Sequence, residues 1–309
     1  MNNQRSPVLI CVLLMFAGLV LWVLTGFTLA DAATPAVNAV DVGSASALRT
    51  QYGALRDRIA NNAFQKPLVL ESSHTSRDVR GDVYAVVPHP FPIVSEALTG
   101  PQSWCDILIL HLNTKLCKTA QSQIGTELIM NVGKKFDQPL ADSFRLTFVW
   151  KLADRQPDYM RVLLQADAGP LSTHDYRITL EASPLANGQT FVHLSYAYGF
   201  GITGNLAMRA YFNTVGRDKV GFTVTGVDKD GQPQYVDGMR GLVERNTMRY
   251  HLAVESYLGA LSLQPSAQFE KRIKDWFLAV ERYPRQLHEI EQDQYLEMKR
   301  KENVRQQDG

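Results

Sequence analysis

Strict alternation of apolar and polar residues runs through the middle of the chain. Such alternation places one side of a strand against a core and the other side in water, which is the pattern of an antiparallel sheet. The segments that carry it, two of them less regularly, are 127–132, 144–152, 159–166, 176–182 and 192–200. Short connections at 153–158 and 184–189, the second with Asn187-Gly188 at its tip, predict hairpins between neighbouring strands.

Helical spacing precedes these strands. In the stretch 48–64, apolar residues recur at the spacing of a helix among Arg and Asp residues. A strand over 83–87 follows, and then one short helix over 93–98. We expect this helix to end at Gly100-Pro101, because Gly and Pro interrupt a helical pattern.

Helices dominate the last third of the chain. We expect, in order, a helix near 204–216, strands near 220–227 and 234–237, and helices over 242–263 and 266–282. The order of a strand, helices, a meander of strands and a long helix predicts an α+β fold. In this fold a curved antiparallel sheet grips a long C-terminal helix, and an extra helical extension follows.

The first residues resemble an export signal. Arg5 precedes an apolar run over 8–29, and an Ala-Asp-Ala cleavage pattern follows at 30–32. The run is about 22 residues, which is long for a signal peptide, so an uncleaved membrane anchor is the alternative. In both cases we expect the rest of the chain to face a non-cytoplasmic space, and the style of the signal suggests a bacterial periplasm.

Composition narrows the class of protein. The 309 residues carry a net charge of +1 and are 45% apolar. A near-neutral chain lacks the basic surface of a nucleic-acid-binding protein, and the apolar content is that of a globular domain. The expected segments are a signal peptide or anchor at 1–32, a linker at 33–47, the α+β domain at 48–283 and a charged helical tail at 284–309. This tail has a thin apolar stripe and is expected to form a peripheral helix.

Two cysteines, Cys105 and Cys117, lie outside the export signal. In an oxidising compartment such a pair predicts a disulfide, with two unpaired thiols or a catalytic or metal-binding pair as alternatives. The bond requires a bend, because a straight strand would separate the two Cα atoms by about 40 Å, against a bridging limit of about 7 Å. We therefore expect a turn and then a strand near 110–117. In this strand, the side chains of Leu110, Leu112 and Leu116 are expected to face the core. Those expected to face the other way are His111, Asn113, Lys115 and Cys117.

A glycine motif at 199–204 fits the pattern G-x-G-x-x-G, and Asp228 follows it. This resembles a dinucleotide-binding fingerprint, which requires a buried parallel strand before the motif and alternating strands and helices after it. The preceding segment alternates instead, and a hairpin and helices follow. We therefore expect no dinucleotide cofactor here, and interpret the glycines as a tight exit from a crowded strand.

Other catalytic and metal-binding patterns are weak. The histidines are dispersed, no metal-ligand spacing occurs, and the G-x-S-x-G pattern of esterases is absent. A pair of carboxylates for glycoside chemistry stays open, because such pairs meet in space and not in sequence. We expect no metal and no cofactor.

The head of the long C-terminal helix carries a polar cluster at 244–250. One interpretation is that Arg245 or Arg249, together with Tyr250, meets the polar head of a ligand that lies under the helix. The alternative is a solvated first turn, or an ion pair such as Arg245 with Asp218.

Aromatic residues concentrate in the alternating segments. They are Phe144, Phe148, Trp150, Tyr176, Tyr196, Tyr198, Phe200 and, further on, Tyr211. They either fill the core between sheet and helix or line a cavity there. Tyrosine hydroxyls that face inward would favour the cavity, because a dry core leaves them unpaired.

The order of elements and the stretch GDVYAVVPHPFPIVSEALTGPQSWCDIL (81–108) resemble the START and polyketide-cyclase superfamily of helix-grip folds. The resemblance covers about residues 80–263 and implies a deep apolar cavity that binds a lipid, sterol or polyketide. Two features depart from the family: the helix and hairpin within 204–237, and the helices beyond 264.

These observations predict a periplasmic carrier for an apolar small molecule such as a lipid, sterol or hopanoid, held between the sheet and the long helix. The predicted ligand-binding residues are Phe148, Trp150, Tyr196, Tyr198, Arg245, Arg249 and Tyr250. We expect no enzymatic activity and no nucleic-acid partner, with membrane association through 8–30 if that segment is uncleaved. The alternatives are a cyclase-like or hydrolytic enzyme on the same scaffold, and a non-catalytic structural protein of the envelope.

Overall fold

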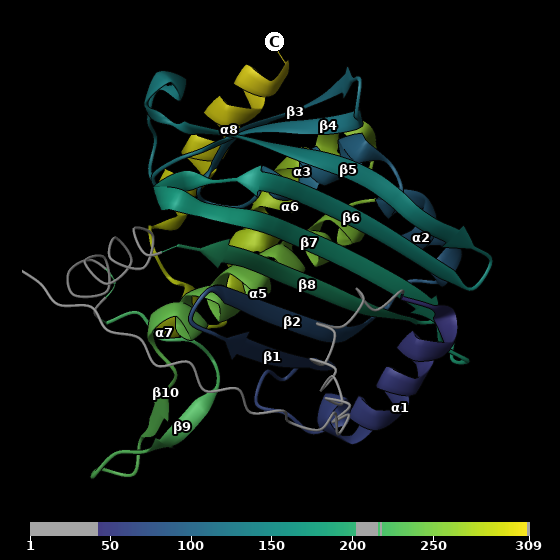
Figure 1. Cartoon of the computed structure of the whole chain (residues 1–309), viewed down its shortest axis with the longest axis vertical. Coiled ribbons are helices and arrows are strands. Elements are labelled where there is room, and N and C mark those ends of the chain that lie inside the picture. Colours follow the sequence, from purple (N-terminus) through teal and green to yellow (C-terminus); the bar gives the residue numbers. More distant parts are fainter. Residues whose placement is uncertain (1–42, 202–215, 217, 308–309) are drawn as a thin grey trace, which may run out of the picture. The chain divides into compact units, whose positions relative to one another are not determined.

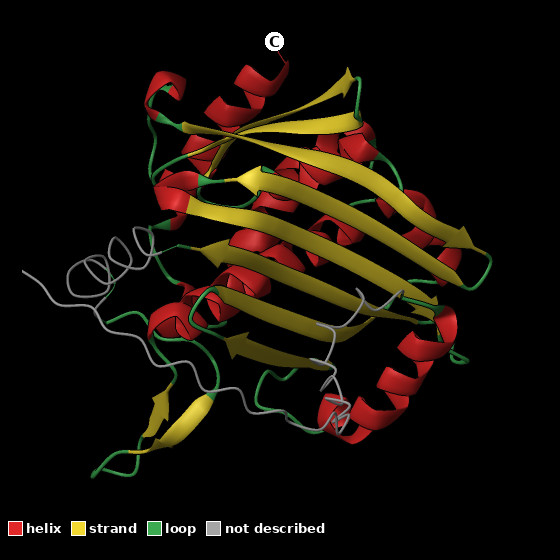
Figure 2. Cartoon of the chain, viewed as in Figure 1, coloured by secondary structure: helices red, strands yellow, loops and turns green. Residues whose placement is uncertain are grey.

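One antiparallel sheet of eight strands organises the chain (Figures 1 and 2). The computed structural model describes residues 43–201, 216 and 218–307, all within one unit, Gly43–Gly309. The strands are β1 (Leu68–His74), β2 (Asp78–Val87), β3 (Thr114–Ser122), β4 (Gly125–Val132), β5 (Phe144–Gln156), β6 (Tyr159–Ala168), β7 (Thr173–Pro184) and β8 (Thr190–Phe200). Their order is β1-β2-β8-β7-β6-β5-β4-β3, so a meander from β3 to β8 returns beside β2.

Helices pack against this sheet. They are α1 (Ala45–Ala60), α2 (Phe91–Leu98), α3 (Pro101–Leu108), α5 (Gly238–Gly259), α6 (Pro265–Val280), α7 (Pro284–Leu287) and α8 (Gln292–Gln307), with single 3-10 turns at Leu140–Asp142 and Pro170–Ser172. Figure 1 looks onto one face of the sheet, with α3, α5 and α6 behind it. The predicted α+β class, in which a curved antiparallel sheet grips a long C-terminal helix, is confirmed.

The alternation in β8 is confirmed, but the face that carries its polar residues is not exposed to water. Tyr196 and Tyr198 belong to the core beneath α5, while Phe191 belongs to a second apolar cluster beneath α1. His193 and Ser195, expected in water, are buried as well. The reason is that α1 and side chains of the neighbouring strands, such as Tyr84 of β2, cover this side of the sheet, so β8 is enclosed from both faces.

The predicted single helix before the meander is two helices. α2 ends at Leu98, and Pro101 begins α3. Proline has no N–H to lose at the first position of a helix and its φ angle already suits that position, so it starts a helix here where we expected it to end one. Strand β1, for which the sequence analysis has no assignment, pairs with β2 at the edge of the sheet.

The N-terminal boundaries also shift. Helix α1 begins at Ala45, inside the predicted linker, and the Ser44 hydroxyl accepts a hydrogen bond from the Ala47 N–H at 3.1 Å as its N-terminal cap. The predicted signal peptide or anchor at 1–32 lies outside the described residues. Within 43–201, 216 and 218–307, no helix is long and apolar enough to cross a membrane.

Strands β9 (Val224–Val227) and β10 (Pro233–Tyr235) form a separate two-stranded sheet. The hairpin projects from the body of the unit in Figure 1. It therefore leaves the meander uninterrupted. The helix expected near 204–216 lies outside the described residues apart from position 216, and so does Tyr211.

The Cys105–Cys117 disulfide is confirmed. Its Cα atoms are 5.1 Å apart, because α3 and the turn after it bring the chain back to β3, as the bend argument requires. The expected facing of this strand is wrong. Lys115 and Cys117 are fully buried and Leu116 is only half-buried. A register shift between Thr114 and Leu116 moves the side chains, and α8 covers this edge of the sheet.

Helix α8 differs from the expected peripheral helix. Tyr295, Met298 and Lys299 are all buried. The Tyr295 hydroxyl donates a hydrogen bond to the Leu110 carbonyl at 2.9 Å, and the Lys299 ammonium donates to the Thr114 carbonyl at 3.0 Å. The helix therefore closes the β3 side of the core.

Candidate functional site

Four tyrosines gather between the concave face of the sheet and α5. Tyr176 from β7, Tyr196 and Tyr198 from β8, and Tyr250 from α5 form a chain of ring contacts. The centroids of Tyr176 and Tyr198 lie 5.2 Å apart in a stacked pair, and Tyr196 meets Tyr250 edge-on at 5.2 Å. Alternation in β8 points both of its tyrosines the same way, and pairing with β7 adds the third.

Burial raises the pKa of each of these phenols, most strongly that of Tyr196. The neighbouring phenols of Tyr176, Tyr250 and Tyr198 add to the effect at Tyr196. The Tyr176 hydroxyl also shares a 2.7 Å hydrogen bond with the Thr173 hydroxyl. The cluster is therefore neutral at physiological pH and presents O–H groups in an apolar setting.

Phe148 and Trp150 of β5 lie on the same concave face. Phe148 meets Tyr176 edge-on at 6.4 Å and extends the aromatic cluster. Trp150, two residues further along the strand, is half-buried and packs against the main core. Its indole Nε1 is buried and makes no hydrogen bond within the described part of the chain. Of the predicted ligand-binding residues, the structure thus brings Phe148, Tyr196, Tyr198 and Tyr250 into one cluster.

The predicted arginines are not on a solvated helix turn. The side chains of Arg245 and Arg249 are 1% and 2% exposed. Arg245 donates from Nη1 to the Val220 carbonyl at 3.1 Å, so it fastens the segment before β9 to α5. Charge-rich helix faces are usually wet, but here α5 lies under the sheet on one side and under connecting segments on the other.

Arg249 belongs to a cluster of charges around Glu289. Its Nη2 lies 2.9 Å from Glu289 Oε1 and donates to the Leu287 carbonyl at 3.1 Å. Lys135 and Lys219 reach the same carboxylate, at 2.5 and 2.9 Å. Burial alone would raise the pKa of Glu289, but Arg249 and the two lysines outweigh it and lower the pKa to about 2. Three cations therefore surround one ionised carboxylate.

Glu244 anchors the start of α5 from the inside. Its carboxylate is fully buried and accepts hydrogen bonds from the N–H groups of Phe222 and Thr223 at 2.6 and 2.9 Å. The Ser72 hydroxyl donates to the same group at 2.6 Å. Glu244 thus ties β1 and the segment before β9 to the helix and is occupied in a structural role.

His111 stands between the tyrosines and the Glu289 cluster. Its ring lies 5.0 Å from that of Tyr250. Burial, and then the nearby cations of Arg249 and Lys299, lower its pKa well below the usual 6.5, so the imidazole is neutral. Nδ1 accepts a hydrogen bond from the Asn113 N–H at 3.2 Å, which leaves the proton on Nε2. The side chain is buried, and the expectation that it faces away from the core is wrong.

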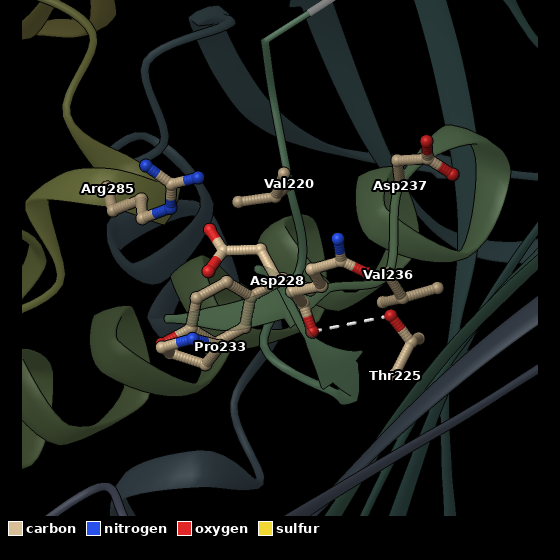
Figure 3. Close-up of a pocket in the computed structure, with 9 residues that line it drawn as sticks. Val220, Thr225, Asp228, Pro233, Val236, Asp237 and Arg285 are labelled. Carbon is tan, nitrogen blue, oxygen red and sulfur yellow. Dashed lines mark hydrogen bonds between the residues drawn. The ribbon is translucent and has the colours of Figure 1, made fainter. Parts of the chain in front are cut away.

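Two openings lie among the described residues, one beside the β9–β10 hairpin and one beside α6 and α7. A groove of about 520 Å³ lies beside the β9–β10 hairpin, with Arg285 at one end and Asp237 at the other (Figure 3). A void of about 10 Å³, the space of one water molecule, lies beside Leu112 and Glu289. Between the sheet and α5, side chains such as Met248 and Leu252 are fully buried.

A second polar cluster lies on the opposite face of the sheet. His193 Nε2 is 2.8 Å from Asp82 Oδ1, and His193 Nδ1 is 3.0 Å from Glu181 Oε2. Arg80 makes a two-pronged contact with Asp82, and the Tyr159 hydroxyl donates to Glu181. Both imidazole nitrogens are occupied by carboxylates. In this arrangement neither imidazole nitrogen is available to take a proton from a nucleophile.

Sequence reasoning missed this cluster because its members are far apart along the chain. Knowledge of the strand pairing would have revealed the cluster. Glu181 and His193 are partners across β7 and β8, and Tyr84 is the partner of His193 across β2 and β8. The described part of the glycine motif lies at the end of β8. Its strand is antiparallel to both neighbours, and Gly199 leaves room for the His174 ring, which a Cβ atom would approach to 2.6 Å. Residues 202–204 of the motif lie outside the described residues.

No family model and no curated protein matches the chain. Among solved structures, norcoclaurine synthase from Thalictrum flavum is similar at 13% identity over 48% of this chain and 78% of that one, with a TM-score of 0.31. A conserved protein from Geobacillus kaustophilus is similar at 12% identity, over 44% and 84% of the two chains, with a TM-score of 0.30. Human StAR-related lipid transfer protein 5 is similar at 8% identity, over 55% and 91%, with a TM-score of 0.29. Function therefore has to be argued from the site.

Proposed function

We propose that the protein binds an apolar small molecule between the concave face of the sheet and α5, without converting it, as a carrier outside the cytoplasm. The observation that supports this proposal is the tyrosine cluster of Tyr176, Tyr196, Tyr198 and Tyr250. The proposed ligand body packs against these rings, and the phenol O–H groups orient it.

In a core that only has to pack, burying the tyrosine hydroxyl is unfavourable in free energy. Elsewhere on the same face, β6, β7 and β8 present aliphatic residues such as Val162, Leu180 and Leu194. A buried phenol loses its hydrogen bonds to water unless a partner replaces them, whereas leucine or phenylalanine carries no such cost. The Thr173 hydroxyl is such a partner for Tyr176. The phenol O–H groups give this face polar atoms that a ligand can meet.

The location outside the cytoplasm and the family of the protein are part of the proposal. The Cys105–Cys117 disulfide supports an oxidising compartment, since such bonds persist outside the cytoplasm. The order of elements and the stretch 81–108 support membership of the START and polyketide-cyclase superfamily. Lipid, sterol and hopanoid are the ligand classes that we propose on this basis.

A binding titration with conservative variants tests the proposal. Dodecanol serves as a neutral apolar probe, with thermal stability and intrinsic fluorescence as readouts. We expect dodecanol to raise the melting temperature of the wild-type protein. The pair of substitutions Tyr196→Phe and Tyr198→Phe should weaken binding by roughly fivefold or more, because each removes a hydrogen-bonding group and keeps the ring.

Tyr235→Phe is the matched control, since this tyrosine lies on the β9–β10 hairpin beneath Arg285. It should bind dodecanol like the wild-type protein. If sterols, hopanoids, fatty acids and dodecanol all leave the melting temperature unchanged, the carrier proposal fails.

The packing of the interior favours a second candidate. Met248, Leu252 and Leu194 are buried to within 1% of full coverage between the sheet and α5. A scaffold whose interior is occupied by its own side chains would serve as a non-catalytic structural protein of the envelope. In that case the tyrosine substitutions change stability, and none of the probes binds.

A further inference from the structure

The β9–β10 hairpin carries apolar side chains on one of its faces. Pro233 pairs with Val227, but Tyr235 pairs with Val224, so β9 has one residue more than β10 across this stretch. Alternate residues of β10 share a face, and partners across a pair share a face as well. The bulge therefore places both valines on the same side as the proline and the tyrosine, and these valines are 56% and 68% exposed. A regular strand would have turned one valine to each face.

The outer edge of β9 is unprotected. β9 and β10 form a sheet of two strands, and no third strand joins it within the described part of the chain. Sheets commonly protect such edges with charged residues or proline, because an unpaired edge is a template for another strand. β10 begins with Pro233, whereas β9 has the sequence Val-Thr-Gly-Val, and all four of its residues are exposed. β9 can therefore accept a further strand.

The hairpin lacks the support of a larger sheet. Its base is fastened where the N–H groups of Phe222 and Thr223 donate to Glu244, but the strands beyond it project from the body of the unit (Figure 1). A hairpin of two strands is marginally stable in water, and three or more strands with an apolar face are needed for independent stability. Further strands paired with β9 would supply that support.

Opposite charges flank the hairpin. Arg285 stands over the Tyr235 ring at 5.9 Å, and Asp228 lies on the turn of the hairpin. Both charged residues line the groove shown in Figure 3, and within the described residues neither side chain makes an ion pair. In an antiparallel pair, the end of one strand lies beside the start of the other. A second β9 in this position would bring its own Asp228 to the start of β9, where Tyr235 and Arg285 lie.

We propose that the protein forms a two-fold symmetric dimer in which the two β9 edges pair antiparallel. The hairpins join into one sheet of four strands, the exposed valines of both copies lie on its apolar face, and Arg285 of each copy pairs with Asp228 of the other. A second copy is the partner that this surface fits, because an isologous interface has to be self-complementary. This one surface carries an open strand edge and both members of the ion pair. The dimer does not depend on the proposed carrier function.

The size of the surface indicates a weak dimer. Nine residues line the groove, and Val224 and Val227 extend this surface. A stable interface has about 20–30 residues on each side. We therefore expect a dissociation constant of roughly 10 μM, with a change from monomer to dimer as the protein concentration rises through that value.

Analytical ultracentrifugation of the full chain between about 1 and about 200 μM tests the dimer. We expect the average mass of the wild-type protein to rise from one copy toward two across this range. Val227→Asp should raise the dissociation constant roughly tenfold or more, because the dimer would bury an unpaired carboxylate. The matched control is Val304→Asp on α8, where the valine is 54% exposed. This control should dimerise like the wild-type protein.

A mixture of charge variants tests the proposed ion pair. Arg285→Asp and Asp228→Lys should each weaken the dimer roughly fivefold or more, because each homodimer would place like charges opposite one another. An equimolar mixture of the two variants should regain the dimer, since both pairs in the mixed dimer then have opposite charges. A mixture that stays monomeric at concentrations where the wild-type protein dimerises would contradict the pairing of Arg285 with Asp228.

A cysteine cross-link captures the strand pairing even in a weak dimer. Gly226→Cys places a thiol within β9, where a Cβ atom would make an ordinary contact of 3.7 Å with the Gln234 side chain. Paired residues of antiparallel strands have Cα atoms about 4.5–5.5 Å apart, within reach of a disulfide. We expect a covalent dimer on a non-reducing gel after mild oxidation. Gly53→Cys on α1, which also has room for a side chain, should stay monomeric.

Each outcome decides the proposal. A protein that stays monomeric up to about 200 μM and forms no cross-link through Gly226→Cys overturns it. A dimer that Val227→Asp leaves unchanged overturns it as well, because the contact then lies elsewhere. Growth beyond two copies contradicts a closed two-fold interface, since contacts between two different surfaces continue into longer assemblies. Loss of the dimer in Val227→Asp, together with the cross-link and recovery in the charge-variant mixture, supports it.

Discussion

His193 shows how much one residue depends on its surroundings. Burial lowers its pKa, but hydrogen bonds to Asp82 and Glu181 outweigh this and raise the pKa above the usual 6.5. Burial likewise raises the pKa of both carboxyls. The hydrogen bonds from His193, together with those from Arg80 at Asp82 and Tyr159 at Glu181, outweigh it, so both pKa values lie below the usual 3.8 and 4.5. The folded protein therefore favours a cationic imidazole between two carboxylates.

This arrangement gives stability a defined dependence on pH. A raised histidine pKa contributes fully below the usual value of 6.5 and is lost as the pH rises through the folded value. Lowered carboxyl pKa values contribute above 3.8 and 4.5 and are lost as the pH falls. We predict that His193→Gln destabilises the protein most between pH 4.5 and 6.5, and less at pH 8. Urea unfolding of both proteins across this range measures the difference, and an equal loss at pH 5.5 and 8 would contradict the assigned charge state.

Single residues could be predicted from the sequence where one element decides their position. Tyr196 and Tyr198 alternate with polar residues in one strand, so their shared inward direction follows from the pattern alone. Arg249 and His111 could not be predicted in the same way. Each is charged or polar in its own segment and becomes buried only when α7, α8 and the β4–β5 connection fold over it.

At the scale of elements, helix α8 is fastened by a buried charge group. Lys115 of β3 and Lys299 of α8 both pair with Glu302, at 3.0 and 2.7 Å, and all three side chains are fully buried. The lysines also donate to the carbonyls of Leu112 and His111, so the helix is joined to the turn before β3.

We predict that Glu302→Gln lowers the free energy of unfolding by about 3–5 kcal/mol, because it leaves two buried ammonium groups without their carboxylate. Chemical unfolding monitored by circular dichroism measures this. The matched variant Glu297→Gln, on the exposed side of the same helix, should change the free energy by less than about 0.5 kcal/mol. Similar effects of the two substitutions would show that α8 is not fastened through Glu302.

The disulfide fastens another pair of elements, α3 and β3. Both cysteines are buried, and the bond spans 12 residues. Replacing both with alanine should cost about 3 kcal/mol, chiefly because the unfolded chain loses a constraint. Thermal unfolding of the oxidised protein and of the double variant gives the difference. Two thiols that react with an alkylating agent in unreduced, exported protein would contradict the bond.

Elements were predictable where local pattern and local chemistry agree. The strands of the meander and the Asn187-Gly188 turn were recognisable, and Gly188 has the positive φ that such a turn requires. The helix boundary at Pro101 was predicted wrongly, because proline can end a helix or begin one. Only the packing of α3 shows that it begins a helix here. The direction of the Lys115 and Cys117 side chains was predicted wrongly. It depends on a register shift with β4 and on the covering helix α8, which belong to other parts of the chain.

At the scale of the whole molecule, the sheet is a meander closed by one long-range pairing. β8 returns to lie against β2, more than 100 residues earlier in the chain, and α5 crosses the concave face against β1, β2 and β8. The order of elements was therefore sufficient to predict the fold class. It was not sufficient to predict where the interior is open, because that depends on how side chains from distant segments fill the space.

The central claim is that this interior binds an apolar molecule. Native mass spectrometry of the protein purified from its own cells, before and after extraction with organic solvent, tests it most directly. We predict one bound molecule per chain, lost on extraction, with a mass in the range of a lipid, sterol or hopanoid. A spectrum that shows only the mass of the polypeptide before extraction, together with no thermal shift from added sterols, hopanoids or fatty acids, would contradict it.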